Sequence, residues 1–279
     1  MPINETLSQY SDWSFESAFA IYVLAFVLLI AQYASARATA VQEKELVGSG
    51  GPVAREGVPG RVVETPKRPL SERLSGMGFA LLILGLVLHI ASVVLRGFAT
   101  ERFPLGNMYE FVAMATAAAA LTSILLLRRR SMRPMLVFVL APIIVLMFLA
   151  ATMLYADAAP VVPALRSFWL PIHVTIVSVG SGIFLVSGVA SLLFLLRIKQ
   201  EAGSESAGFW GRFASKLPDA QALDRLAYKT TIIAFPLFGA GVILGAIWAE
   251  AASALRANAT NSRVKIMRDI VLPPCEGSV

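Results

Sequence analysis

The chain has 279 residues, of which 57% are hydrophobic and 15% are charged, and its mean hydropathy is +0.70. Soluble domains carry about 25% charged residues, so this composition excludes a soluble protein and predicts an all-α, polytopic membrane helix bundle. A single cysteine, Cys275, excludes a disulfide framework and any two-cysteine metal or redox motif. The net charge of +6 falls in particular loops, which indicates membrane topology and a lipid environment, with no nucleic-acid partner.

Six apolar runs are long enough to cross about 30 Å of hydrocarbon as helices. Helices are expected because an open sheet edge would leave backbone polar groups unsatisfied in lipid. The predicted spans lie near residues 18–34, 76–95, 111–127, 135–154, 174–196 and 230–248.

Lysine and arginine alternate between the two sides of this predicted bundle. Seventeen of them lie in the segments of about 35–75, 128–134 and 197–229, against three in the intervening loops, Arg96, Arg102 and Arg166. Cytoplasmic loops carry the excess of basic residues, so the three basic segments are predicted to be cytoplasmic loops. The protein is then expected in the plasma membrane, with both termini extracytoplasmic.

Two of the predicted cytoplasmic segments have a sequence pattern that predicts their local structure. Residues 48–69 are rich in Gly, Pro and charge and are expected to form a flexible linker. Further on, Asp219 is expected to cap a short helix with an apolar stripe of Leu223, Leu226 and Ala227. That helix is expected to lie on the membrane surface.

The chain has two histidines. His89 lies within the second predicted span and is expected to face the bundle and bond a neighbour, although an ionisable residue in a span is also a functional candidate. His173 lies at the outer end of the fifth span, behind a loop with Trp169. It is either a helix-end residue of the interfacial aromatic belt or a group that changes charge or ligates a metal.

The loop before the third span reads Arg102-Phe-Pro-Leu-Gly-Asn-Met-Tyr-Glu110. Pro104 and Gly106 predict a turn, and Asn107 is expected to cap the following helix. Capping does not explain Glu110, a carboxylate at the membrane edge beside an apolar residue.

Three ordered motifs carry a resemblance to a known family. The loop 102–110 is similar to a Pro-x-x-Asn-x-Tyr-Glu signature, and residues 162–174 are similar to Val-Pro-Ala-Leu-x-Ser-x-Trp-Leu-x-Ile-His-Val. A third stretch, 235–250, resembles a later motif of the same family. From about residue 10 to 250 the chain resembles the CcsA/ResC cytochrome c biogenesis proteins, most closely their actinobacterial members.

This resemblance implies one half of the system II cytochrome c synthetase, acting with a ResB/CcsB-type membrane partner. Such a complex presents b-type haem (heme) at the outer membrane face for thioether formation with the Cys-x-x-Cys-His motif of apocytochrome c. The resemblance assigns His173 as one axial ligand of the haem iron, a role that suits a neutral imidazole. Trp169 and Trp248 are expected to contribute an apolar bed for the macrocycle. No catalytic residue is assigned.

The resemblance ends near residue 250. The family continues into Trp-Gly-x-x-Trp-x-Trp-Asp and two more spans, about eight in all, whereas no tryptophan follows Trp248 here and no histidine follows His173. The expected organisation is a CcsA/ResC-like transmembrane domain at 1–250 and a divergent tail at 251–279, suggesting a truncated or frameshifted product. The alternative function is a non-catalytic six-span membrane protein or assembly partner that no longer holds haem, so enzymatic activity stays an open question.

Overall fold

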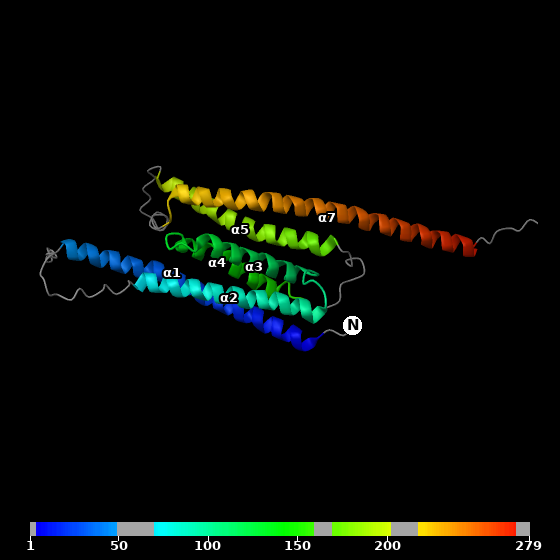
Figure 1. Ribbon diagram of the computed structural model, residues 1–279, viewed down its shortest axis with the longest axis horizontal. Coiled ribbons are helices and arrows are strands. Elements are labelled where there is room, and N and C mark those ends of the chain that lie inside the picture. Colours follow the sequence, from blue (N-terminus) through cyan, green and yellow to red (C-terminus); the bar gives the residue numbers. More distant parts are fainter. Residues whose placement is uncertain (1–3, 49–69, 159–168, 202–216, 272–279) are drawn as a thin grey trace, which may run out of the picture.

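In the computed structural model the chain forms long helices that run alternately in opposite directions (Figure 1). The structure describes residues 4–48, 70–158, 169–201 and 217–271, and within these ranges it contains helices and no strand. The elements are α1 (Glu5–Gly48), α2 (Leu70–Thr100), α3 (Met108–Leu127), the 3-10 helix η1 (Arg133–Met135), α4 (Leu136–Thr152), α5 (Trp169–Glu201) and α7 (Ala220–Val271). The all-α polytopic bundle predicted from composition is therefore confirmed.

All six predicted spans are present. The described helices that are long and apolar enough to cross a membrane are Glu5–Gln32, Leu70–Thr100, Met108–Leu127, Arg133–Thr152, Trp169–Lys199 and Ala220–Glu250. One difference from prediction is at α1, which begins thirteen residues before the apolar run at 18. Polar residues in these extra turns have partners on α2: the Ser11 hydroxyl donates to the Ser92 carbonyl at 2.8 Å.

The pairing of α1 with α2 follows a heptad pattern. Buried residues of α1 recur at alternating steps of four and three, as Ser11, Phe15, Ala18, Tyr22, Ala25 and Leu29. Glycines of α2 face two of the large ones: a Cβ at Gly85 would lie 2.7 Å from the Tyr22 ring, and one at Gly78 would lie 2.8 Å from Leu29. Large side chains thus fill positions opposite small ones, as in membrane helix pairs with small residues at their interface.

The other helices pack outward from this pair. α3 and α4 lie beside α1 and α2, α5 packs on α3, and α7 packs along α5 at the edge of the bundle (Figure 1). The starts of α1, α3 and α5 and the ends of α2 and α4 share one end of the bundle, which we call the His173 end. The opposite end, where α3 is followed by η1, is called the Arg130 end.

The segment around Asp219 differs from its prediction in one respect. A helix does begin at Ala220, and Leu223 and Leu226 are buried. Its placement on the membrane surface is wrong, because these residues form the first turns of α7 in line with the span. The Ser187 hydroxyl of α5 lies 2.6 Å from that of Thr231, which helps to bind the start of α7 into the bundle.

Other predictions concern residues at the margins of the described chain. Apart from Gly48, which is the last residue of α1, the expected linker at 48–69 lies outside the described residues. Arg166 and most of the motif at 162–174 also lie outside them. At the C-terminal side, α7 continues as one helix through residue 250 to Val271.

Candidate functional site

His173 begins the second turn of α5 and is joined to α7. Its Nδ1 atom lies 2.6 Å from the carbonyl oxygen of Gly241, and the ring is partly buried. A carbonyl oxygen only accepts hydrogen bonds, so Nδ1 is the nitrogen that carries the proton. The lone pair of the neutral ring is then on Nε2. Histidines that ligate metals commonly have this arrangement, with the second nitrogen donating to a backbone carbonyl.

Two glycines of α7 allow α5 to approach closely enough for this bond. A Cβ at Gly245 would lie 2.5 Å from Cε1 of His173, and a Cβ at Gly241 would lie 2.6 Å from a methyl carbon of Val177. The glycines are four residues apart, the small-xxx-small spacing that brings membrane helices into contact. Any larger residue at either position would push α5 and α7 apart.

The two tryptophans predicted to accompany His173 lie at the same end of the bundle. Trp169 is the first residue of α5, about 6 Å from His173 along the helix axis by helix rise, and is 49% exposed. Trp248 follows Gly245 by three residues, so it shares the face of α7 that packs against α5, and it is half-buried. The three predicted site residues therefore belong to one pair of packed helices.

A second cluster at the His173 end surrounds Glu110, the carboxylate that capping did not explain. Asn107 caps α3 as predicted, accepting from the Glu110 backbone N–H at 2.8 Å. The Glu110 side chain, 1% exposed, accepts from both Nη atoms of Arg102 at 2.9 and 3.0 Å. It also accepts from the Gly106 backbone N–H at 2.6 Å. Through these hydrogen bonds Glu110 holds the loop at 102–107 against the start of α3.

Arg96, near the end of α2, is also part of this cluster. Its side chain is 2% exposed, and its Nε lies 3.5 Å from Glu110 Oε1 while Nη1 lies 3.2 Å from Asp12 Oδ1 of α1. Nη2 donates to the Ala156 carbonyl. The guanidinium carbon also lies 5.3 Å from the Tyr109 ring centroid, a favourable cation–π distance. One buried cation therefore ties α1, α2, α3 and the chain after α4 together.

The turn that follows α2 brings Arg102 to Glu110. The Arg102 N–H donates to the Gly97 carbonyl and the Glu101 N–H to the Phe98 carbonyl, the bonding pattern of a Schellman helix end. Glu101 accordingly has a left-handed φ of 48°. A non-glycine residue is strained there, and the ion pair made by the next residue helps to hold the turn.

Tyr155, after α4, extends the cluster to the surface. Its hydroxyl donates to Asp12 Oδ2 at 2.8 Å. The pKa of Tyr155 is raised above its usual value near 10, mainly by partial burial and secondly by the hydrogen bond to the Asp12 carboxylate. The phenol is consequently held in its neutral, donating form beside Arg96.

His89 faces the interior, as predicted, with no exposed surface. Its ring meets Phe15 and Tyr22 edge to face, at centroid distances of 5.6 and 5.9 Å. The Ala113 carbonyl lies near the ring, but neither ring nitrogen has a partner with hydrogen-bond geometry. The predicted bond to a neighbour is therefore not formed with hydrogen-bond geometry, and the printed ring contacts of His89 are aromatic.

Sequence reasoning did not identify Asp12, Arg96 or Tyr155 as members of the cluster around Glu110. The available signal was the placement of Arg96 and Glu110, each an ionisable residue at the margin of an apolar run, where an unpaired charge is costly. Tyr155 and Asp12 are 143 residues apart, and no local pattern links them.

Comparisons with known proteins agree with these motifs. A family described as "Cytochrome C assembly protein" matches residues 105–254, more than half of the chain. A cytochrome c biogenesis protein CcsA of Synechococcus sp. (strain CC9902) is 32% identical over 203 residues, 65% of this chain. Proteins of the same name from Prochlorococcus marinus (strain MIT 9303) and Chlamydomonas reinhardtii are 30% and 32% identical over 58% and 63% of this chain.

The matches cover 66%, 58% and 48% of the lengths of these three relatives, so the chain spans less than two thirds of each. The family match begins within the loop fastened by Glu110 and includes His173, Gly241, Gly245 and Trp248. The chain therefore belongs to the cytochrome c assembly protein family.

Proposed function

We propose that this protein handles haem for cytochrome c maturation, presenting it at the outer membrane face as a subunit of a cytochrome c synthetase. The observation that carries the proposal is the hydrogen bond from His173 Nδ1 to the Gly241 carbonyl. It directs the free lone pair to Nε2, and neutral imidazole is a good axial ligand for haem iron. The alternative of a non-catalytic membrane protein is not favoured over this role.

The surroundings of His173 support haem as the bound substrate. Trp169 and Trp248 supply aromatic surface near the ring, and a flat, apolar macrocycle packs well on such surface. In this proposal His173 binds the iron and the tryptophans contact the porphyrin. The protein positions the haem, and the reactive vinyl groups belong to the substrate.

The proposal requires the His173 end to face outward. The excess of lysine and arginine in the segments at the opposite end supports that orientation. A ResB-type membrane protein and apocytochrome c are the proposed partners, the first lying in the membrane and the second approaching the His173 end.

The test is deletion of the gene in its native host. We expect covalent haem, detected by peroxidase staining of denaturing gels, to disappear from c-type cytochromes while b-type haem proteins keep their spectra. The wild-type gene should restore the stain, and a His173→Ala gene should not. Normal c-type cytochromes in the deletion strain would contradict the proposed function.

A further inference from the structure

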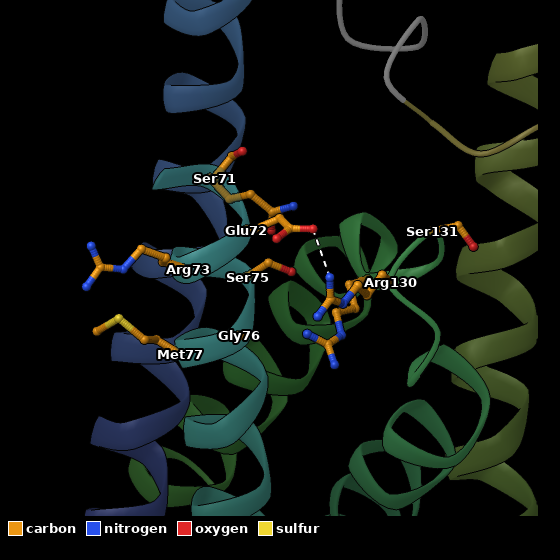
Figure 2. Close-up of a pocket in the computed structure, with 10 residues that line it drawn as sticks. Ser71, Glu72, Arg73, Ser75, Gly76, Met77, Arg130 and Ser131 are labelled. Atoms are coloured by element: carbon orange, nitrogen blue, oxygen red, sulfur yellow. Dashed lines mark hydrogen bonds and ion pairs between the residues drawn. The ribbon is translucent and has the colours of Figure 1, made fainter. Parts of the chain in front are cut away.

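A pocket lies at the Arg130 end, between the first turns of α2 and the loop that joins α3 to η1 (Figure 2). Its volume is about 640 Å³, within the range of sites that hold small ligands. We call it the Arg130 pocket. The polar side chains that line it include Ser71, Glu72, Arg73, Ser75, Arg130 and Arg133.

The charges of this pocket are unequal, with three arginines against one carboxylate. Figure 2 shows Glu72 and Ser75 pointing from α2 toward Arg130, and Arg73 pointing away from them. Glu72 and Arg130 form an ion pair at 2.9 Å, with side chains 42% and 67% exposed. Exposed pairs of this kind are weak, so a bound anion can share the Arg130 guanidinium with Glu72.

Arg133 supplies a second, pre-oriented cation. Its Nε donates to the Arg128 carbonyl at 3.4 Å, and its guanidinium carbon lies 4.5 Å from the Phe79 ring centroid. No carboxylate in the described part of the chain lies within ion-pair distance of Arg133. Glu72 neutralises the charge of Arg130, and the positive charge of Arg133 is therefore not neutralised by a carboxylate of the described residues.

Ser75 adds a hydroxyl group. The residue is 7% exposed and lines the pocket. A hydroxyl facing a pocket beside two guanidinium groups fits an anion with several acceptor oxygens.

We propose that the Arg130 pocket binds the phosphate of an anionic phospholipid headgroup. Arg130 and Arg133 bind phosphate oxygens, and the Ser75 hydroxyl donates to another. Guanidinium groups match phosphate geometry, and basic pockets between transmembrane helices recognise lipid headgroups. The pocket lies at the ends of the spans, where headgroups are, which favours a lipid over a soluble phosphate. The inference is independent of the proposed haem chemistry.

The experiment is native mass spectrometry of the full chain in detergent, titrated with phosphatidylglycerol or with phosphatidylcholine. The variants are Arg130→Gln, Arg133→Gln and Ser75→Ala. Arg129→Gln is the matched control, since Arg129 is exposed in the same arginine run and does not line the pocket. We expect wild-type protein to prefer phosphatidylglycerol, with about a five-fold loss of affinity for each pocket guanidinium removed. Arg129→Gln should bind as wild type does, and Ser75→Ala should weaken binding without a change of charge.

Three results would overturn the inference. Equal binding of the two lipids would exclude recognition of an anionic headgroup. An equal loss in Arg129→Gln would reduce the effect to general surface charge. Binding of glycerol 3-phosphate as tightly as phosphatidylglycerol would assign the pocket to a soluble phosphate. Thermal unfolding midpoints within error of wild type for each variant establish that a loss of binding reflects the pocket and not the fold.

Discussion

Arg96 and Glu110 form an ion pair in which both side chains are almost fully buried, 2% and 1% exposed, with Nε and Oε1 3.5 Å apart. Neither charge is isolated, because Asp12 contacts the same arginine and Arg102 the same carboxylate. Two cations and two carboxylates therefore balance within one cluster. Such an arrangement is stable only while every member has its partners.

Replacing Glu110 with Gln removes the shared acceptor and leaves two guanidinium groups facing an amide. Breaking a buried ion pair on one side costs about 3–5 kcal/mol, so the thermal unfolding midpoint in detergent should fall markedly. The matched control is Glu72→Gln, which breaks an exposed pair worth about 0–1 kcal/mol. Equal midpoints for the two variants would show that the Glu110 cluster contributes no more than a surface pair.

The same cluster predicts a response to alkaline pH. The pKa of Tyr155 is raised in the folded state, so its stabilising contribution is complete below pH 10 and is lost as the phenol ionises above it. In a titration followed by tyrosinate absorbance, the difference between wild type and Tyr155→Phe should show one tyrosine with a midpoint above 10. A midpoint below 10 would contradict the hydrogen bond to Asp12.

Glycine substitutions on α7 test the contact between α5 and α7. Gly245→Ala places a Cβ against the His173 ring, and overpacking of this kind costs about 1–3 kcal/mol. Gly239→Ala is the control, because its Cβ would meet nothing within 4 Å, and alanine is favoured over glycine inside a helix. Thermal midpoints should fall for the first variant and hold or rise for the second.

A double variant separates this packing from other effects. His173→Ala removes the ring that the new Cβ would meet, so Gly245→Ala should destabilise the His173→Ala background less than the wild type. Additive losses in the double variant would mean that the ring and the glycine do not contact one another.

Membrane orientation follows from charge and is checked with reporter fusions. Alkaline phosphatase fused at Gly50, Ser131 or Ser204 should be inactive, and a cytoplasmic reporter at the same sites should be active, because these segments carry most of the lysine and arginine. An active phosphatase at any of the three positions contradicts the proposed orientation.

Hydropathy was enough to predict the fold class and all six spans, since length and apolar character decide whether a helix crosses lipid. It could not place the start of α1 at Glu5. The polar residues Ser11 and Asp12 are tolerated there only because Ser92 and Arg96 lie opposite them. Helix boundaries at polar turns depend on partners that are distant in sequence.

The residues of the candidate site were proposed from the sequence and stay a prediction, whereas the geometry around them could not be predicted. The motif around His173 identified the imidazole, and the tryptophans followed from the family resemblance. The hydrogen bond to Gly241 required the packing of α5 against α7, although the four-residue spacing of Gly241 and Gly245 is a readable sign of a close helix contact. The charge balance around Glu110 required four separate segments of chain.

The proposed ligation of haem iron by Nε2 of His173 is tested by the absorption spectrum of haem in the purified full chain, with and without added imidazole. Wild type and His89→Phe, which removes the other imidazole, should share one Soret and α-band spectrum. His173→Ala should lose haem or shift its Soret band, and added imidazole should restore the wild-type spectrum, because free imidazole replaces a missing ligand but not a missing helix contact. An unchanged spectrum in His173→Ala would contradict the claim and leave His173 as a residue that joins α5 to α7.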